Sequence, residues 1–170
     1  MGQARIALPG AKGLGVYRPH RQTSLNTRKK KQMAPKELEA KQLHEGPFLT
    51  ILWDTPRRII GIRWKPATAR MTDEDFKGAL TLSADQVERM GAHGILVDVS
   101  DFHHRMGQGV QEWRVKNISS RYTAAGVRRF AFLFPPGAEI PPKMNQSAAG
   151  ESFLTRAFLS QEEAVAWLTP

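Results

Sequence analysis

The sequence contains no cysteine. Disulfide bonds, thiolate nucleophiles and cysteine-ligated metals are therefore excluded, and the composition suits a reducing compartment. Long apolar runs are also missing, since none is longer than the FAFLF of residues 130–134, whereas a membrane helix needs roughly 20 apolar residues. Residues 1–20 carry no apolar stretch of the secretory kind. We expect a soluble, cytoplasmic protein without a transmembrane segment.

Acidic residues are missing from the first part of the chain. Residues 1–32 hold eight Lys or Arg and no Asp or Glu, whereas the other 138 residues hold 17 basic and 16 acidic side chains. The net charge of +9 therefore belongs almost wholly to this arm. A charged segment without hydrophobic periodicity cannot bury enough apolar surface to offset the entropy lost on ordering. We interpret residues 1–32 as disordered, and residues 1–45 as a basic tail before a domain that spans 46–170.

Three interpretations of the basic arm are open. Clustered lysines bind phosphates, which favours association with nucleic acid through the tail. A basic segment without acids is also typical of organellar transit peptides, although Gly and Pro interrupt any amphipathic helix here. In the third interpretation, which we favour, the natural start is Met33 and the arm is upstream sequence read in frame, because the composition changes abruptly there.

The rest of the chain alternates strand and helix patterns. Residues 48–54 and 59–64 are rich in β-branched and aromatic side chains and flank a turn-compatible Thr-Pro, which predicts an antiparallel hairpin. Thr72 and the three acids after it are typical of a helix start. This helix is expected to end at Gly91 and to pack on a sheet through an apolar stripe made of Phe76, Ala79, Leu80, Val87 and Met90.

Two later segments, residues 94–100 and 128–134, are apolar on both faces, as central parallel strands are. Residues 106–122 show a helical pattern with untidy spacing, and Pro and Gly break residues 135–152 into a loop. A short strand at 154–158 comes before the last helix. The order predicts an α/β fold with a mixed, mostly parallel sheet, an N-terminal antiparallel hairpin and helices packed on the sheet.

The end of the chain, TRAFLSQEEAVAWL, contains a capping-box pattern at Ser160 and Glu163. Together with the LVDVS strand at 96–100 and the order of elements, this segment resembles the SpoIIAA-like branch of the STAS superfamily, and the likeness covers about residues 46–170. The matching residues of the segment are Phe158, Glu162, Glu163, Ala164, Trp167 and Leu168.

The resemblance implies a small non-enzymatic α/β domain. Classical members are switch proteins that bind a kinase-like regulator and are phosphorylated on a serine after a parallel strand; here Ser100 stands beside Asp101 and departs from the Asp-Ser-Ser-Gly-like turn of those members. Similarity of the fold to CRAL-TRIO lipid carriers implies an apolar ligand between sheet and helices. We therefore expect a regulatory or protein-binding domain, with a carrier of a small lipid-like ligand as the alternative.

Polar residues crowd the turn after the strand 94–100, where ligand crevices of open α/β sheets occur. We expect this turn to recognise a protein partner or a ligand. Its candidate residues are Asp98, Ser100, Asp101, His103, His104, Arg105, Gly107 and Gly109. The alternatives are structural: Asp98 accepting hydrogen bonds from the next amides, one histidine packed and one solvated, and the glycines forming an ordinary turn rather than an anion site.

The aromatic residues Trp113, Phe130, Phe132 and Phe134 are candidate walls of an apolar pocket, and they are equally the residues that a plain core needs. The sequence offers no Ser-His-acid order, carboxylate pair, nucleophile elbow or metal-ligand spacing. We expect no enzymatic activity, no metal and no cofactor.

Overall fold

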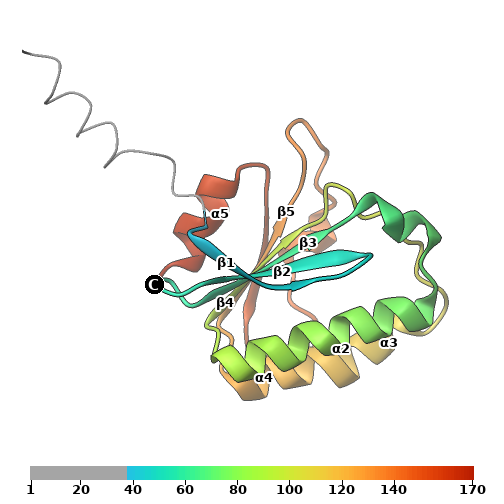
Figure 1. Ribbon diagram of the computed structural model, residues 1–170, viewed down its shortest axis with the longest axis horizontal. Helices are drawn as coiled ribbons and strands as arrows, with labels where there is room; N and C mark the ends of the chain where they lie inside the picture. The colour runs from blue at the N-terminus through green and yellow to red at the C-terminus, as the bar shows by residue number, and fades with distance from the viewer. Residues whose placement is uncertain (1–37) are drawn as a thin grey trace, which may run out of the picture. The chain divides into compact units, whose positions relative to one another are not determined.

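The computed structural model describes residues 38–170, which form an α/β domain (Figure 1). The predicted disorder of residues 1–32 and the alternative start at Met33 lie outside the described residues. The described strands are β1 (Ala40–Glu45), β2 (Leu49–Asp54), β3 (Ile59–Trp64), β4 (Gly94–Asp98), β5 (Arg129–Leu133) and β6 (Leu154–Phe158). They form one sheet in the order of the chain.

The sheet is mixed, as the sequence predicts. β1, β2 and β3 pair antiparallel, whereas β3, β4, β5 and β6 pair parallel. The hairpin expected over residues 48–64 is confirmed as β2 and β3. The two strands expected to be central and parallel are also neighbours, with Ile95 paired to Phe130.

The domain begins earlier than the sequence predicts. Residues 40–45, assigned to the tail, form the edge strand β1 beside β2. Its side chains are mostly exposed and its register shifts between Gln42 and His44, so no apolar alternation marks it as a strand. Polar contacts hold its end instead: Glu45 pairs with Lys65 and accepts a hydrogen bond from Thr50 Oγ1 at 2.7 Å. The boundary at residue 46 is therefore wrong.

The described helical segments are η1 (Pro66–Arg70), α2 (Asp73–Met90), α3 (Val110–Arg114), η2 (Val115–Ser119), α4 (Ser120–Ala125), η3 (Pro142–Asn145) and α5 (Gln161–Leu168). α2 begins at a full capping box, in which Thr72 Oγ1 accepts from Asp75 N at 3.1 Å and Asp75 Oδ2 accepts from Thr72 N at 2.9 Å. It ends at Gly91, whose φ of 63° is the left-handed conformation that glycine tolerates best. Both ends are where the sequence predicts them.

α3, η2 and α4 make one continuous helix with a π turn in the middle. A π turn adds one residue to the turn of an α-helix. Trp113 lies just before the π turn and Ile118, five residues further on, lies within it, which explains the untidy spacing of the sequence pattern. The helix begins at Val110 rather than at residue 106, because residues 99–109 form a hydrogen-bonded loop.

Helices cover the two faces of the sheet unequally (Figure 1). α2 and the helix 110–125 lie on one face, and α5 lies on the other, against β4, β5 and β6. Two apolar clusters result, one on each face. In residues 38–170, no helix combines the length and the apolar character that a membrane span needs.

Candidate functional site

A cavity of about 650 Å³ lies between the sheet and the helices α2 and 110–125. Its walls are mainly aromatic and aliphatic. The sheet supplies Ile62, Trp64, Val97, Phe130 and Phe132, the helical segments supply Phe76, Leu80, Ile118, Tyr122 and Met144, and the loops supply Val99, Phe102, Met106, Phe134 and Phe153. Several of these residues follow the carboxyl ends of β3, β4 and β5, which is where open α/β sheets hold ligands.

The size of the cavity sets it apart from a packing defect. Protein interiors rarely leave spaces larger than a water molecule, whereas ligand pockets measure about 300–1,000 Å³. The space is also partly open to the surface rather than enclosed. Solvent or a ligand therefore fills this space. Phe132 and Phe134 are half-buried rather than buried because they face it.

Polar side chains enter the lining from the helix 110–125 and from the segment between β5 and β6. Arg114 Nε donates to Gln111 Oε1 at 3.2 Å. Glu151 is fully engaged, since Oε1 accepts from Ser119 Oγ at 2.5 Å and Oε2 accepts from Ala148 N at 2.7 Å. Its role is to tie the β5–β6 segment to the helix and so close that side of the cavity.

Tyr122 is the most deeply placed polar group of the lining. Its residue is only 2% exposed, and its ring lies 6.1 Å from that of Phe130 and 6.3 Å from that of Phe153. Burial raises the pKa of the phenol strongly, although the charges of Arg114 and Arg121 oppose the shift. The hydroxyl group therefore stays protonated and can donate a hydrogen bond at any physiological pH.

The loop 99–109 forms part of the cavity wall through Phe102 and Met106. A wholly buried threonine, Thr68, holds its middle: Oγ1 accepts from His103 N at 2.9 Å and lies 3.0 Å from the carbonyl oxygen of Asp101. Because this hydroxyl bonds the backbone of the loop, the loop is fixed against η1.

A second anchor holds the end of the loop to the start of α2. Asp73 Oδ1 lies 2.8 Å from His104 Nε2 and accepts from Gly107 N at 3.2 Å. These two contacts, the Gly107 amide first, hold the pKa of Asp73 below its ordinary value. A Cβ at residue 107 would lie 2.3 Å from Asp73 Oδ2, so only glycine allows this approach.

Aromatic packing adds to the two polar anchors. The ring of Phe102 lies 5.1 Å from that of Trp64 and 5.7 Å from that of Phe76, and the ring of His104 lies 5.6 Å from that of Phe76. The histidine pair therefore divides as one of the structural alternatives predicts: His104 is half-buried and His103 is exposed.

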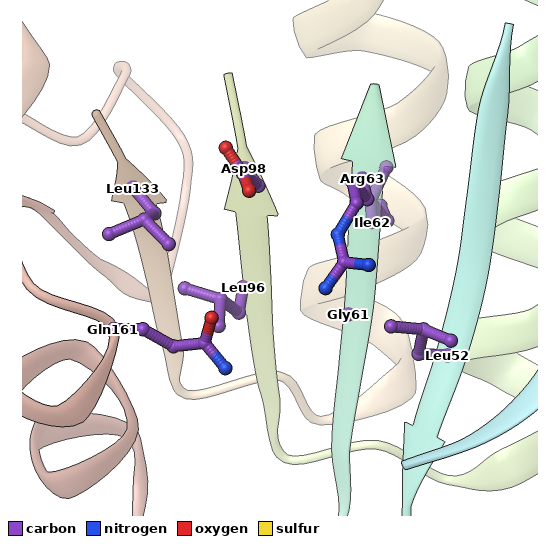
Figure 2. Close-up of a pocket in the computed structure, with 8 residues that line it drawn as sticks. All are labelled: Leu52, Gly61, Ile62, Arg63, Leu96, Asp98, Leu133 and Gln161. Atoms are coloured by element: carbon purple, nitrogen blue, oxygen red, sulfur yellow. The ribbon is translucent and has the colours of Figure 1, made fainter. Parts of the chain in front are cut away.

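The residues predicted for the polar turn do not form one cluster. Asp98 lies on the α5 face of the sheet, opposite the cavity, and its Oδ1 accepts from Ser100 N at 3.0 Å. Figure 2 shows it near the end of β4, with Arg63 on the neighbouring strand. The hollow here measures about 10 Å³, which is room for about one water molecule. It is too small for a ligand.

The remaining turn residues have different surroundings. Asp101, His103 and Arg105 are exposed on the loop. Gly109, with a φ of 80°, ends the loop, and its carbonyl accepts from Trp113 N at 3.0 Å at the start of α3. Backbone contacts and the His104 side chain therefore hold the turn in place, whereas the side chains of Asp101, His103 and Arg105 are exposed.

The aromatic candidates are placed more simply. Phe130, Phe132 and Phe134 line the cavity, whereas Trp113 does not, because it packs beside α2 with Lys77 Nζ 5.4 Å from its ring centroid. Sequence reasoning missed Phe102 and Arg114. Arg114 stands four residues before Ile118 and eight before Tyr122, so the i, i+4 spacing within the helix would have placed it on the cavity side.

No group of three His, Asp or Glu that could hold a metal ion occurs in residues 38–170. No protein-family model, curated protein or solved structure matches the chain. The resemblance to the STAS superfamily therefore stays a prediction from the sequence.

Proposed function

We propose that this protein binds a small apolar ligand in the cavity between the sheet and the helices α2 and 110–125. The observation that carries the proposal is a space of about 650 Å³ whose walls are predominantly aromatic and aliphatic, with polar side chains supplied by the helix 110–125 and the segment between β5 and β6. This combination of size and lining is typical of sites for small molecules. When a ligand removes the apolar side chains of the cavity from water, the burial of their surface contributes favourable free energy to binding.

The anchored loop 99–109 supports the same proposal. Thr68 and Asp73 hold it as a rigid wall, so Phe102 and Met106 can present a fixed apolar surface to a ligand. A preformed wall lowers the conformational entropy that binding costs. Recognition of a protein partner through this loop stays a prediction, as does nucleic-acid association through the tail.

The test uses N-phenyl-1-naphthylamine, an uncharged dye whose fluorescence rises in apolar surroundings. The wild-type protein should bind it saturably, with one site per chain. Val99→Trp, which places an indole into the cavity from the end of β4, should abolish dye binding and leave the protein folded. Far-ultraviolet circular dichroism and thermal melting check the fold of each variant.

Leu154→Trp is the matched control. Leu154 lies on the edge strand β6, is 62% exposed and is not part of the cavity lining, so an indole there adds the same apolar surface elsewhere. This variant should bind the dye as the wild type does. Absence of saturable binding by the folded wild type, or unchanged binding by folded Val99→Trp, would show the proposal to be wrong.

A further inference from the structure

The charges of the cavity lining do not balance. Arg114 and Lys143 are its basic residues, and Glu151 is its acidic residue. Both carboxylate oxygens of Glu151 already accept hydrogen bonds, from Ser119 and from Ala148. A predominantly apolar cavity therefore carries excess positive charge.

Within residues 38–170, two arginines form ion pairs, and Arg114 is among those that do not. Arg121 bonds to Asp85 and Glu88, each at 2.6 Å, and Arg57 pairs with the buried Asp54 at 2.7 Å. Across residues 38–170, no carboxylate lies within ion-pairing distance of Arg114. Its Nε bond to Gln111 fixes the guanidinium and leaves the two terminal nitrogens, the pair that a carboxylate binds side by side.

The position of Arg114 suits the head of an elongated ligand. It is half-buried, whereas Ile118 and Tyr122, one and two turns further along the same helix, are buried. The cavity lining thus changes along this helix from a cationic end to an apolar end. Phe130, Phe132 and Phe134 extend the apolar part over the sheet, and the Tyr122 hydroxyl adds a neutral donor.

We infer that the ligand is an amphiphile with a carboxylate head and an apolar body, with the carboxylate bound by Arg114 and the body held against the phenylalanines of β5. This inference rests on the proposed function, since it names the class of ligand for the same cavity. A charged head at an arginine fork gives direction to binding, because the opposite orientation would bury the carboxylate among aromatic rings.

The test compares dodecanoate with 1-dodecanol, which share a twelve-carbon chain and differ in the charge of the head. Each competes with N-phenyl-1-naphthylamine for the wild-type protein near pH 7.5. Dodecanoate should displace the dye at roughly tenfold lower concentration than dodecanol, the effect of one charge-assisted contact at a partly solvated site. Arg114→Gln should remove this difference, with the displacement by each competitor measured relative to the dye affinity of the variant itself.

Lys116→Gln is the control for charge. Lys116 is exposed on the same helix and outside the lining, so its loss removes one positive charge without touching the cavity. The preference for dodecanoate should persist in this variant. If the dye binds but dodecanoate and dodecanol compete equally, or if Arg114→Gln keeps the preference, the inference fails and the proposed apolar site stands. If the dye itself does not bind, the proposed function fails.

Discussion

The two faces of the sheet are packed with side chains of different size. On the α5 face, the strands carry Ile59, Leu96, Leu133 and Phe158, and between them the small residues Gly94 and Ala131 meet Ala164 and Leu168 of the helix. On the opposite face, the strands carry large residues, among them Ile62, Trp64 and the phenylalanines of β5, yet this face borders a cavity of about 650 Å³. The face with the bulkier side chains is the less completely filled.

The difference follows from how closely a helix can approach. A Cβ added at Gly94 would lie 3.2 Å from Leu168 Cδ2, so the small strand residues bring α5 into direct contact with the sheet. On the other face, large aromatic rings keep α2 and the helix 110–125 further from the sheet. The rings do not fill the space that this separation leaves between them. Side-chain bulk in a sequence is therefore a poor guide to packing.

Leu168→Ala should cause the largest loss of stability. Leu168 is 2% exposed in the tightly packed cluster under α5, so its truncation should lower the free energy of unfolding by about 2–5 kcal/mol. Phe134→Ala, in the half-buried wall of the cavity, should cost only about 1 kcal/mol although it removes more atoms. Urea unfolding of both variants measures the contrast, and equal losses would contradict it.

Gly94→Ala should have an intermediate effect. The added methyl group meets Leu168 at less than ordinary contact distance, so overpacking should lower the free energy of unfolding by about 1–3 kcal/mol. Gly78→Ala is the matched change, because Gly78 is exposed in α2 with nothing within 4 Å of its added Cβ. It should raise stability by about 0.5–1 kcal/mol, since alanine favours helix. A Gly94→Ala variant as stable as Gly78→Ala would show that α5 is not closely packed.

Asp73→Asn should have the smallest effect on the free energy of unfolding, and this effect should depend on pH. The Gly107 amide and His104 lower the pKa of Asp73 from its ordinary value of 3.8. A carboxyl group with a lowered folded pKa adds stability that is present above its unfolded pKa and is lost as the pH falls through the folded pKa.

The stability difference between wild type and Asp73→Asn should therefore shrink between about pH 5 and about pH 2. Urea unfolding across this range measures it. Glu74→Gln is the control, because Glu74 is exposed on the same helix turn and its one ion pair within residues 38–170 is with Lys77, at 3.4 Å. A difference that stays constant with pH would show that the Asp73 anchor does not hold the loop.

Local patterns predicted most of the fold. The capping box at Thr72, the glycine at residue 91 and the doubly apolar strands 94–100 and 128–134 are each determined by neighbours in sequence, and each is found as predicted. β1 was not predicted from the sequence because an edge strand with mostly exposed side chains needs no apolar alternation. The π turn was not predicted because its backbone hydrogen bonds, which join residues five positions apart, leave only an irregular spacing in the sequence.

The candidate site was predictable only in part. Phe130, Phe132 and Phe134 share one face because strand side chains alternate, so their grouping follows from the sequence. The turn 98–109 looked like a site because it is rich in polar groups, yet its backbone bonds to Thr68 and its His104 side chain lies against Asp73, each more than 30 residues away in the chain. Nothing in the local sequence tells a polar group that binds a ligand from one that binds its own domain.

The sequence by itself determined most of the strands and helices and which face each of those strand side chains takes, because these depend on backbone preference and periodicity over a few residues. Only the tertiary structure decided that a cavity remains beside β5 and that Arg114 borders it. Distances between elements depend on how closely all the side chains at a contact let them approach, and that is a property of the assembled layers rather than of any one segment.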